Sequence, residues 1–84
     1  MKIHLKYFAS IREGLGQGSE HIEAAATTVG TLRDELIARG GAYAQVLARG
    51  KAVRVALNQT MVADETTALN EGAEVAFFPP VTGG

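Results

Sequence analysis

The sequence contains no cysteine, so it forms no disulfide, offers no thiol for catalysis and supplies no thiolate ligand for zinc. Its formal net charge is only −1, which gives no broad positive surface for nucleic acid. No apolar run reaches the length of a membrane-spanning helix, and residues 1–6 lack the apolar core of a signal peptide. From these absences we expect a cytoplasmic protein that binds neither nucleic acid nor a membrane.

What is present describes one small globular domain of 84 residues, 46% hydrophobic and 20% charged. Ile3, Leu5 and Tyr7 alternate with polar residues, which predicts a strand with one buried face. Weaker strand patterns follow over residues 20–24, 53–57, 60–63 and 74–78. The order of these segments predicts an α+β fold.

The clearest helix signal begins at Thr28, a suitable N-cap, and continues through Val29, Leu32 and Leu36 to a stop at Gly40-Gly41. Thr31 stands at the N3 position in place of Glu or Gln, which predicts that this helix lacks a capping box. Shorter helical turns are expected over residues 9–14 and 43–48. One main helix covers only one face of a sheet, so the other face meets water or a partner.

The last residues form the most informative segment. Phe77-Phe78-Pro79-Pro80 is followed by Val81-Thr82 and then by Gly83-Gly84. Two glycines without side chains enter a channel too narrow for other residues and leave the carboxylate of Gly84 open to attack. We therefore predict that Gly84, with Gly83 before it, is the reactive site. A chance Gly-Gly at a frayed end, or the remnant of an expression tag, would give the same residues.

The two prolines predict where the domain ends. Because proline has no backbone N–H, Pro79 and Pro80 cannot continue the ladder of the final strand, and each favours an extended residue before it. Six extended residues would reach about 19 Å. We therefore divide the chain into a domain over residues 1–78 and an extended tail over residues 79–84.

Three large apolar side chains are predicted to point away from the core. If Tyr7 faces inward, alternation places Phe8 outward, and Phe78 faces outward by the same argument. Met61 follows the expected turn at Asn58-Gln59 and lies near them. Exposed apolar side chains favour a partner surface, which we expect to include Phe8, Met61 and Phe78 together with the tail residues Pro79, Pro80, Val81 and Thr82.

Other polar residues do not suggest chemistry. His4 and His21 lie on different expected strands with no ligand at metal-binding spacing, so no metal site is predicted. The acidic pairs Asp34-Glu35 and Asp64-Glu65 are interpreted as solvated surface residues that do not converge on one site. The chain therefore has no catalytic machinery of its own.

Several segments resemble the small subunit of molybdopterin synthase, a family of sulfur carriers among the ubiquitin-like β-grasp proteins. The resemblance rests on residues 55–60, on Leu69 and Gly72, and above all on the ending from Phe77 to Gly84. It implies a β-grasp fold with a mixed sheet of about five strands and one main helix packed on one face.

The resemblance also implies a chemistry. An adenylyltransferase of the ubiquitin-activating type would use ATP to adenylate the Gly84 carboxylate, and sulfur would then replace AMP to give a thiocarboxylate. The tail would deliver this sulfur to cyclic pyranopterin monophosphate in the large synthase subunit, within a heterotetramer of two small and two large subunits. The chain would bind no cofactor itself and would be the non-catalytic donor subunit of a sulfurtransferase.

Two alternatives stay open. Related carriers with the same fold serve thiazole synthesis or tRNA thiolation, or act as protein modifiers. A protein of a different class, an interaction module with an inert tail, would also fit the composition.

Overall fold

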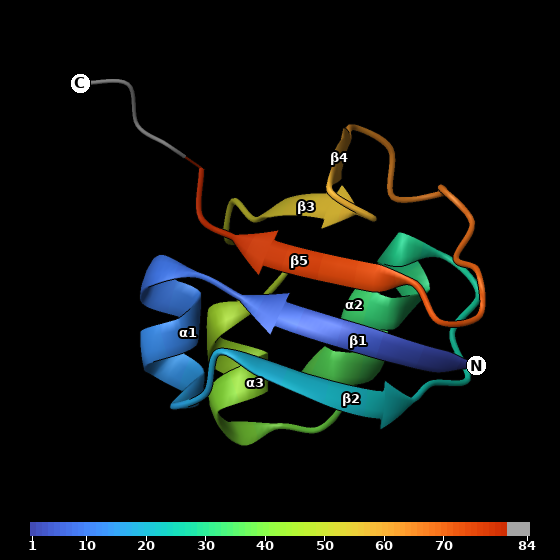
Figure 1. Ribbon diagram of the computed structural model, residues 1–84. Helices are drawn as coiled ribbons and strands as arrows, with labels where there is room; N and C mark the ends of the chain where they lie inside the picture. Colours follow the sequence, from blue (N-terminus) through green and yellow to red (C-terminus); the bar gives the residue numbers. More distant parts are fainter. Residues whose placement is uncertain (81–84) are drawn as a thin grey trace.

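A computed structural model describes residues 1–80. Its centre is a five-stranded mixed sheet in the order β2-β1-β5-β3-β4 (Figure 1). β1 and β5 run parallel, and the other neighbouring strands are antiparallel. The strands are β1 (Lys2–Tyr7), β2 (Ser19–Glu23), β3 (Arg54–Leu57), β4 (Thr60–Val62) and β5 (Glu74–Phe78). This architecture confirms the predicted α+β fold with a mixed sheet.

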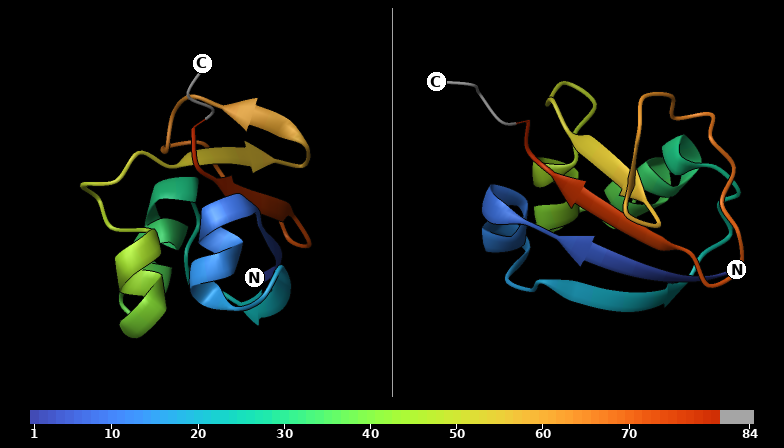
Figure 2. Two further views of the ribbon diagram at one scale, coloured as in Figure 1. Left: turned by 90° about the vertical axis from the view of Figure 1, so that its left-hand side faces the viewer. Right: turned by 45° about the horizontal axis from the view of Figure 1, so that its top comes forward.

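Three helices pack on one face of the sheet and leave the other face open (Figure 2). They are α1 (Ala9–Leu15), α2 (Val29–Ile37) and α3 (Gly41–Val46). None of the helices within residues 1–80 is long and apolar enough to cross a membrane. β5 ends beside α1, and the N-terminus lies at the opposite end of the sheet (Figure 1).

The core lies between the sheet and the helices. Ile3, Leu5 and Tyr7 of β1 are all buried, as the alternation predicted, while the polar residues between them face the open side. Leu32 and Leu36 of α2 are fully buried against them. The apolar stripe of this short helix therefore stabilises its position under the sheet.

The start of α2 corrects one prediction. Thr28 is the N-cap as expected, and its hydroxyl oxygen accepts a hydrogen bond from the Thr31 N–H at 3.2 Å. The Thr31 hydroxyl oxygen in turn accepts from the Thr28 N–H at 3.0 Å. The helix therefore has a capping box after all, because a threonine hydroxyl reaches back far enough to replace the usual carboxylate.

The end of α2 also differs from the prediction. The helix ends at Ile37, before the two glycines, and Gly40 instead precedes α3 with a φ of 76°. Arg39 is outside the helix and forms an ion pair with Glu20 of β2 at 3.2 Å. This pair draws the segment between α2 and α3 toward β2.

Glu20 is the centre of a polar cluster that fixes α3 against the sheet. Its carboxylate accepts hydrogen bonds from the hydroxyls of Tyr7 at 2.8 Å and Tyr43 at 2.6 Å, and from Gln17 at 3.1 Å. Burial opposes ionisation of this carboxyl, but the hydrogen bonds from Tyr43, Tyr7 and Arg39 outweigh it and hold the pKa of Glu20 below its usual value.

This lowered pKa predicts a pH-dependent contribution to stability. A carboxyl whose pKa is lower in the folded state stabilises the fold above its unfolded pKa and loses that effect as the pH falls through the folded value. Glu20→Gln should therefore lower the free energy of unfolding at pH 7 by about 1–2 kcal/mol. The difference in unfolding free energy between the parent and Glu20→Gln should shrink as the pH falls below 4.5, the ordinary pKa of a glutamate side chain. Urea unfolding at several pH values measures it, with the exposed Glu13→Gln as control. A pH-independent difference would contradict the assignment.

Candidate functional site

The parallel pairing of β1 with β5 brings two phenylalanines together at the end of the sheet. Tyr7 lies opposite Phe77, and the Phe8 N–H donates to the Phe77 carbonyl at 3.1 Å. The next side chains, Phe8 and Phe78, meet edge to face with ring centroids 6.2 Å apart. The end of the last strand is thus held by the end of the first.

Of these two rings, Phe8 is exposed as predicted and Phe78 is less exposed than predicted. Phe8 is 46% exposed, as expected, although it caps α1 and does not extend β1. Phe78, in contrast, is half-buried, because its ring packs against that of Phe8. The expectation of two exposed phenylalanines therefore holds for Phe8 and only in part for Phe78. The pair presents one apolar surface, with Phe8 outermost.

Met61 continues this surface across the open face. It is 49% exposed on β4 and lies opposite Ala56 of β3, which in turn lies opposite Ala76 of β5. Both alanines alternate with core residues and so point to the open face, yet they are only 9% and 6% exposed. We call the five residues Phe8, Ala56, Met61, Ala76 and Phe78 the tail-root surface.

Beyond β5 the chain passes a narrow notch. Pro79 and Pro80 are half-buried and outside any strand, consistent with their missing N–H groups. Pro79 borders a cavity of about 120 Å³ that separates α1 from the segment before β3. Its other lining residues are Ser10, Ile11, Val46, Lys51, Ala52 and Val53. Val81, Thr82, Gly83 and Gly84, which the sequence analysis placed in the site, lie outside the described residues.

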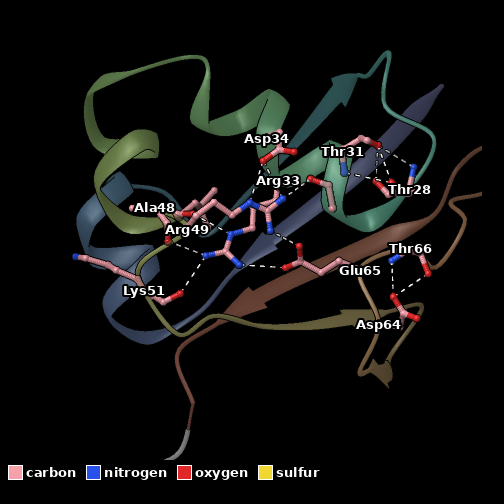
Figure 3. Close-up of polar contacts among 12 residues, drawn as sticks. Thr28, Thr31, Arg33, Asp34, Ala48, Arg49, Lys51, Asp64, Glu65 and Thr66 are labelled. Carbon is pink, nitrogen blue, oxygen red and sulfur yellow. Dashed lines mark hydrogen bonds and ion pairs between the residues drawn. The ribbon is translucent and has the colours of Figure 1, made fainter.

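A cluster of charged residues joins α2 to the segment after α3 and to the loop after β4 (Figure 3). Asp34 and Glu65, one from each acidic pair, both form ion pairs with Arg49. Glu65 also pairs with the buried Arg33 at 3.1 Å. The hydrogen bond from Arg49, followed by that from Arg33, holds the pKa of Glu65 below its usual value against the effect of burial.

The interpretation of the acidic pairs holds within each pair: Asp34 binds Arg49 while Glu35 binds the backbone of Ala25 and Ala26, and Asp34 is 61% exposed. The sequence did not indicate that one member of each pair, Asp34 of α2 and Glu65 of the loop after β4, would meet the other at Arg49 (Figure 3).

The two histidines are also closer than the sequence indicated. His4 and His21 lie directly opposite each other on β1 and β2, and their rings stack with centroids 4.2 Å apart. They border a hollow of about 490 Å³ near the start of β1. Residues 1–80 contain no group of three or more potential metal ligands close enough to hold an ion. This hollow lies near the start of β1, whereas the tail leaves beyond the end of the parallel strand β5.

Comparisons with known proteins point in one direction. The ThiS family matches residues 5–84. The chain is 42% identical over 82 residues to the molybdopterin synthase sulfur carrier subunit of Escherichia coli (strain K12), covering 98% of this chain and 99% of that protein.

Two solved structures have the same fold over the whole chain. SAMP1 of Haloferax volcanii is 27% identical with a TM-score of 0.77, and the match covers all of both chains. A complex of subunits 1 and 2 of the molybdopterin-converting factor of Helicobacter pylori 26695 contains a chain that is 25% identical with a TM-score of 0.69, again over all of both chains.

The tail-root surface should contribute little to the stability of the fold. Met61→Ala should lower the free energy of unfolding by less than about 1 kcal/mol, because half of the side chain is already in water. Leu5→Ala, at a fully buried position of the same sheet, should cost about 2–5 kcal/mol. Urea unfolding of both variants compares them. A loss for Met61→Ala as large as that for Leu5→Ala would show that this surface is structural.

Proposed function

The chain belongs to the ThiS family, and we propose that it is the sulfur carrier subunit of a molybdopterin synthase. The observation that carries this proposal is the 42% identity to a sulfur carrier subunit over almost the full length of both proteins. The β-grasp sheet supports it as well, because its last strand leads into Pro79-Pro80 and toward the terminal glycines.

The proposed chemistry takes place at Gly84. A carboxylate oxygen attacks the α-phosphorus of ATP, releases pyrophosphate and forms an acyl-adenylate. A hydrosulfide equivalent then attacks the acyl carbon and displaces AMP, which leaves a thiocarboxylate and a proton. A carboxylate is a poor electrophile, and adenylation provides the leaving group that this exchange needs. Because the sequence has no cysteine, no persulfide on this chain competes as the sulfur-bearing group.

The sulfur then goes to cyclic pyranopterin monophosphate. The thiocarboxylate sulfur attacks a substrate carbon and displaces an oxygen substituent from it, and water then cleaves the acyl–sulfur bond, which leaves the sulfur on the substrate and restores the Gly84 carboxylate. Two such donations build the dithiolene of molybdopterin. This chain supplies the sulfur and the tail that carries it to the partner's active site. The catalytic side chains belong to the partner.

Two partners follow from this chemistry. The first is a large synthase subunit that covers the tail-root surface and takes the tail into its active site, in a heterotetramer of two small and two large subunits. The complex of the two converting-factor subunits from Helicobacter pylori supports such a pairing. The second is an adenylyltransferase of the ubiquitin-activating type, which binds the ATP. We place the reaction in the cytoplasm.

A second candidate function is protein modification. The match to SAMP1 of Haloferax volcanii favours it, because the name SAMP1 stands for small archaeal modifier protein 1. In this case the activated Gly84 carbonyl would form an isopeptide bond with a lysine of a target protein. Both functions share the adenylation step and separate only at the acceptor. Recovery of Gly84-linked lysine conjugates from cells would support the modifier.

The position of the terminal carboxylate tests the proposed function. Adding one residue after Gly84 should abolish sulfur transfer to cyclic pyranopterin monophosphate in a reconstituted assay, since the reactive carbonyl moves away from its place. Removal of Gly83 and Gly84 should have the same effect, while the melting temperature stays within about 2 °C of the parent because terminal residues bury little surface. Activity of the extended chain would favour an inert tail and an interaction module.

The tail-root surface should bind the large subunit. Phe8→Ala and Phe78→Ala should each weaken this binding about tenfold or more, as the loss of an aromatic anchor does at the centre of an interface. Ile22→Ala, at a half-buried position near the other end of the sheet, is the matched control and should leave binding unchanged. Calorimetric titration measures the dissociation constants. Equal effects for all three variants would mean that lost stability, and not lost contact, weakens binding.

A further inference from the structure

One wall of the notch beside Pro79 has no regular secondary structure. The segment from Leu47 to Val53 connects α3 to β3, and its residues Lys51, Ala52 and Val53 face the cavity that Pro79 borders. A turn closed by the Lys51 N–H and the Ala48 carbonyl at 2.9 Å is its local backbone contact. Such a segment needs support from elsewhere to keep a fixed shape.

One source of this support is a buried side chain, Arg33. Arg33 of α2 is 5% exposed, and its guanidinium donates to three carbonyls of this segment (Figure 3). The distances are 2.8 Å to Leu47, 2.7 Å to Ala48 and 3.0 Å to Lys51. The ion pair with Glu65 balances the buried charge. Arg33 thus fixes the backbone just before the wall of the notch.

A second arginine, Arg49, belongs to the segment itself and links it to the same helix. Arg49 donates to the carbonyl of Gly30 at 2.9 Å and pairs with Asp34 and Glu65. Gly30 and Asp34 belong to α2, whose Leu32 and Leu36 are fully buried in the core. The wall of the notch is therefore anchored through α2 to the rigid centre of the domain.

We propose that Arg33 is a positioning residue for sulfur transfer: by holding the carbonyls of Leu47, Ala48 and Lys51 it fixes the notch wall that sets the direction in which Pro79 and Pro80 carry the tail. The inference rests on the proposed function, because the tail has to reach an acceptor. Pro79 and Pro80 have a fixed φ, so a direction set at the notch is passed on to the residues after them.

Lysine cannot replace arginine in this role. The planar guanidinium presents five N–H donors in a rigid fork, which lets Arg33 reach three carbonyls and a carboxylate together. A lysine ammonium keeps the charge that Glu65 needs but donates from a single point. Arg33→Lys should therefore leave the core in place and release part of the segment.

Electron paramagnetic resonance measures the direction of the tail without any sulfur chemistry. Because the sequence has no cysteine, a thiol-reactive spin label attaches only to the two cysteines introduced by the substitutions Ser19→Cys and Val81→Cys in one chain. We expect a narrow distribution of distances between the labels in the parent chain and a broadened or shifted one in Arg33→Lys. Ile22→Ala, which is destabilised at the far end of the sheet, should keep the parent distribution. Equal distributions in the parent and in Arg33→Lys would overturn the proposal, as would equal broadening in both variants.

Sulfur transfer by chains without spin labels provides the second measurement. The assay is run at a temperature at which urea unfolding shows that every variant is folded. At saturating large subunit, Arg33→Lys should lower kcat about tenfold, as a misplaced reacting group does, while KM changes little. Ile22→Ala should retain the parent kcat. A changed distance distribution with an unchanged kcat would overturn the positioning role. Absence of sulfur transfer in the parent chain would instead contradict the proposed function, and the distance measurement would still decide whether Arg33 aims the tail.

Discussion

The parallel pairing of β1 with β5 is the contact on which the candidate site depends. It places the first and last strands side by side at the centre of the sheet, so Tyr7 lies opposite Phe77 and Phe8 packs against Phe78. Because neighbouring strands cover both edges of this pair, β5 is held on each side up to its last residues. The chain that leaves β5 therefore starts from one of the most constrained positions in the fold.

This constraint separates the body of the domain from its tail. The core between the sheet and the helices is built from side chains such as Leu5, Leu32 and Phe77, which are fully buried. Pro79 and Pro80, the last residues that the structure describes, add no strand pairing to it. In the proposed function, this separation lets the domain stay folded while its last residues enter a partner. The same separation explains why the chemistry is assigned to the terminal carboxylate and the recognition to the tail-root surface.

The sequence predicted those features that depend on local periodicity. Alternation in β1 placed Ile3, Leu5 and Tyr7 in the core, and the prolines placed the end of β5 at Phe78. The aromatic and Gly-Gly ending carried the resemblance that the family match supports.

The features that sequence reasoning missed depend on contacts between distant segments. Nothing local indicates that Phe78 is shielded by Phe8, or that Glu65 and Asp34 meet at Arg49. The prediction that α2 lacks a capping box failed for another reason. The expected pattern allowed only Glu or Gln at the N3 position, where the hydroxyl of Thr31 also suffices. Arg33 was overlooked because a charged residue in a helix usually faces water.

In the proposed function, sulfur travels on the carboxyl group of Gly84. This claim is tested most directly by the intact mass of the chain after incubation with ATP, a sulfur donor and the activating enzyme. We expect a gain equal to the exchange of one oxygen for one sulfur, located by fragmentation at Gly84 and dependent on ATP. An unchanged mass under these conditions, or sulfur found at any other residue, would contradict it.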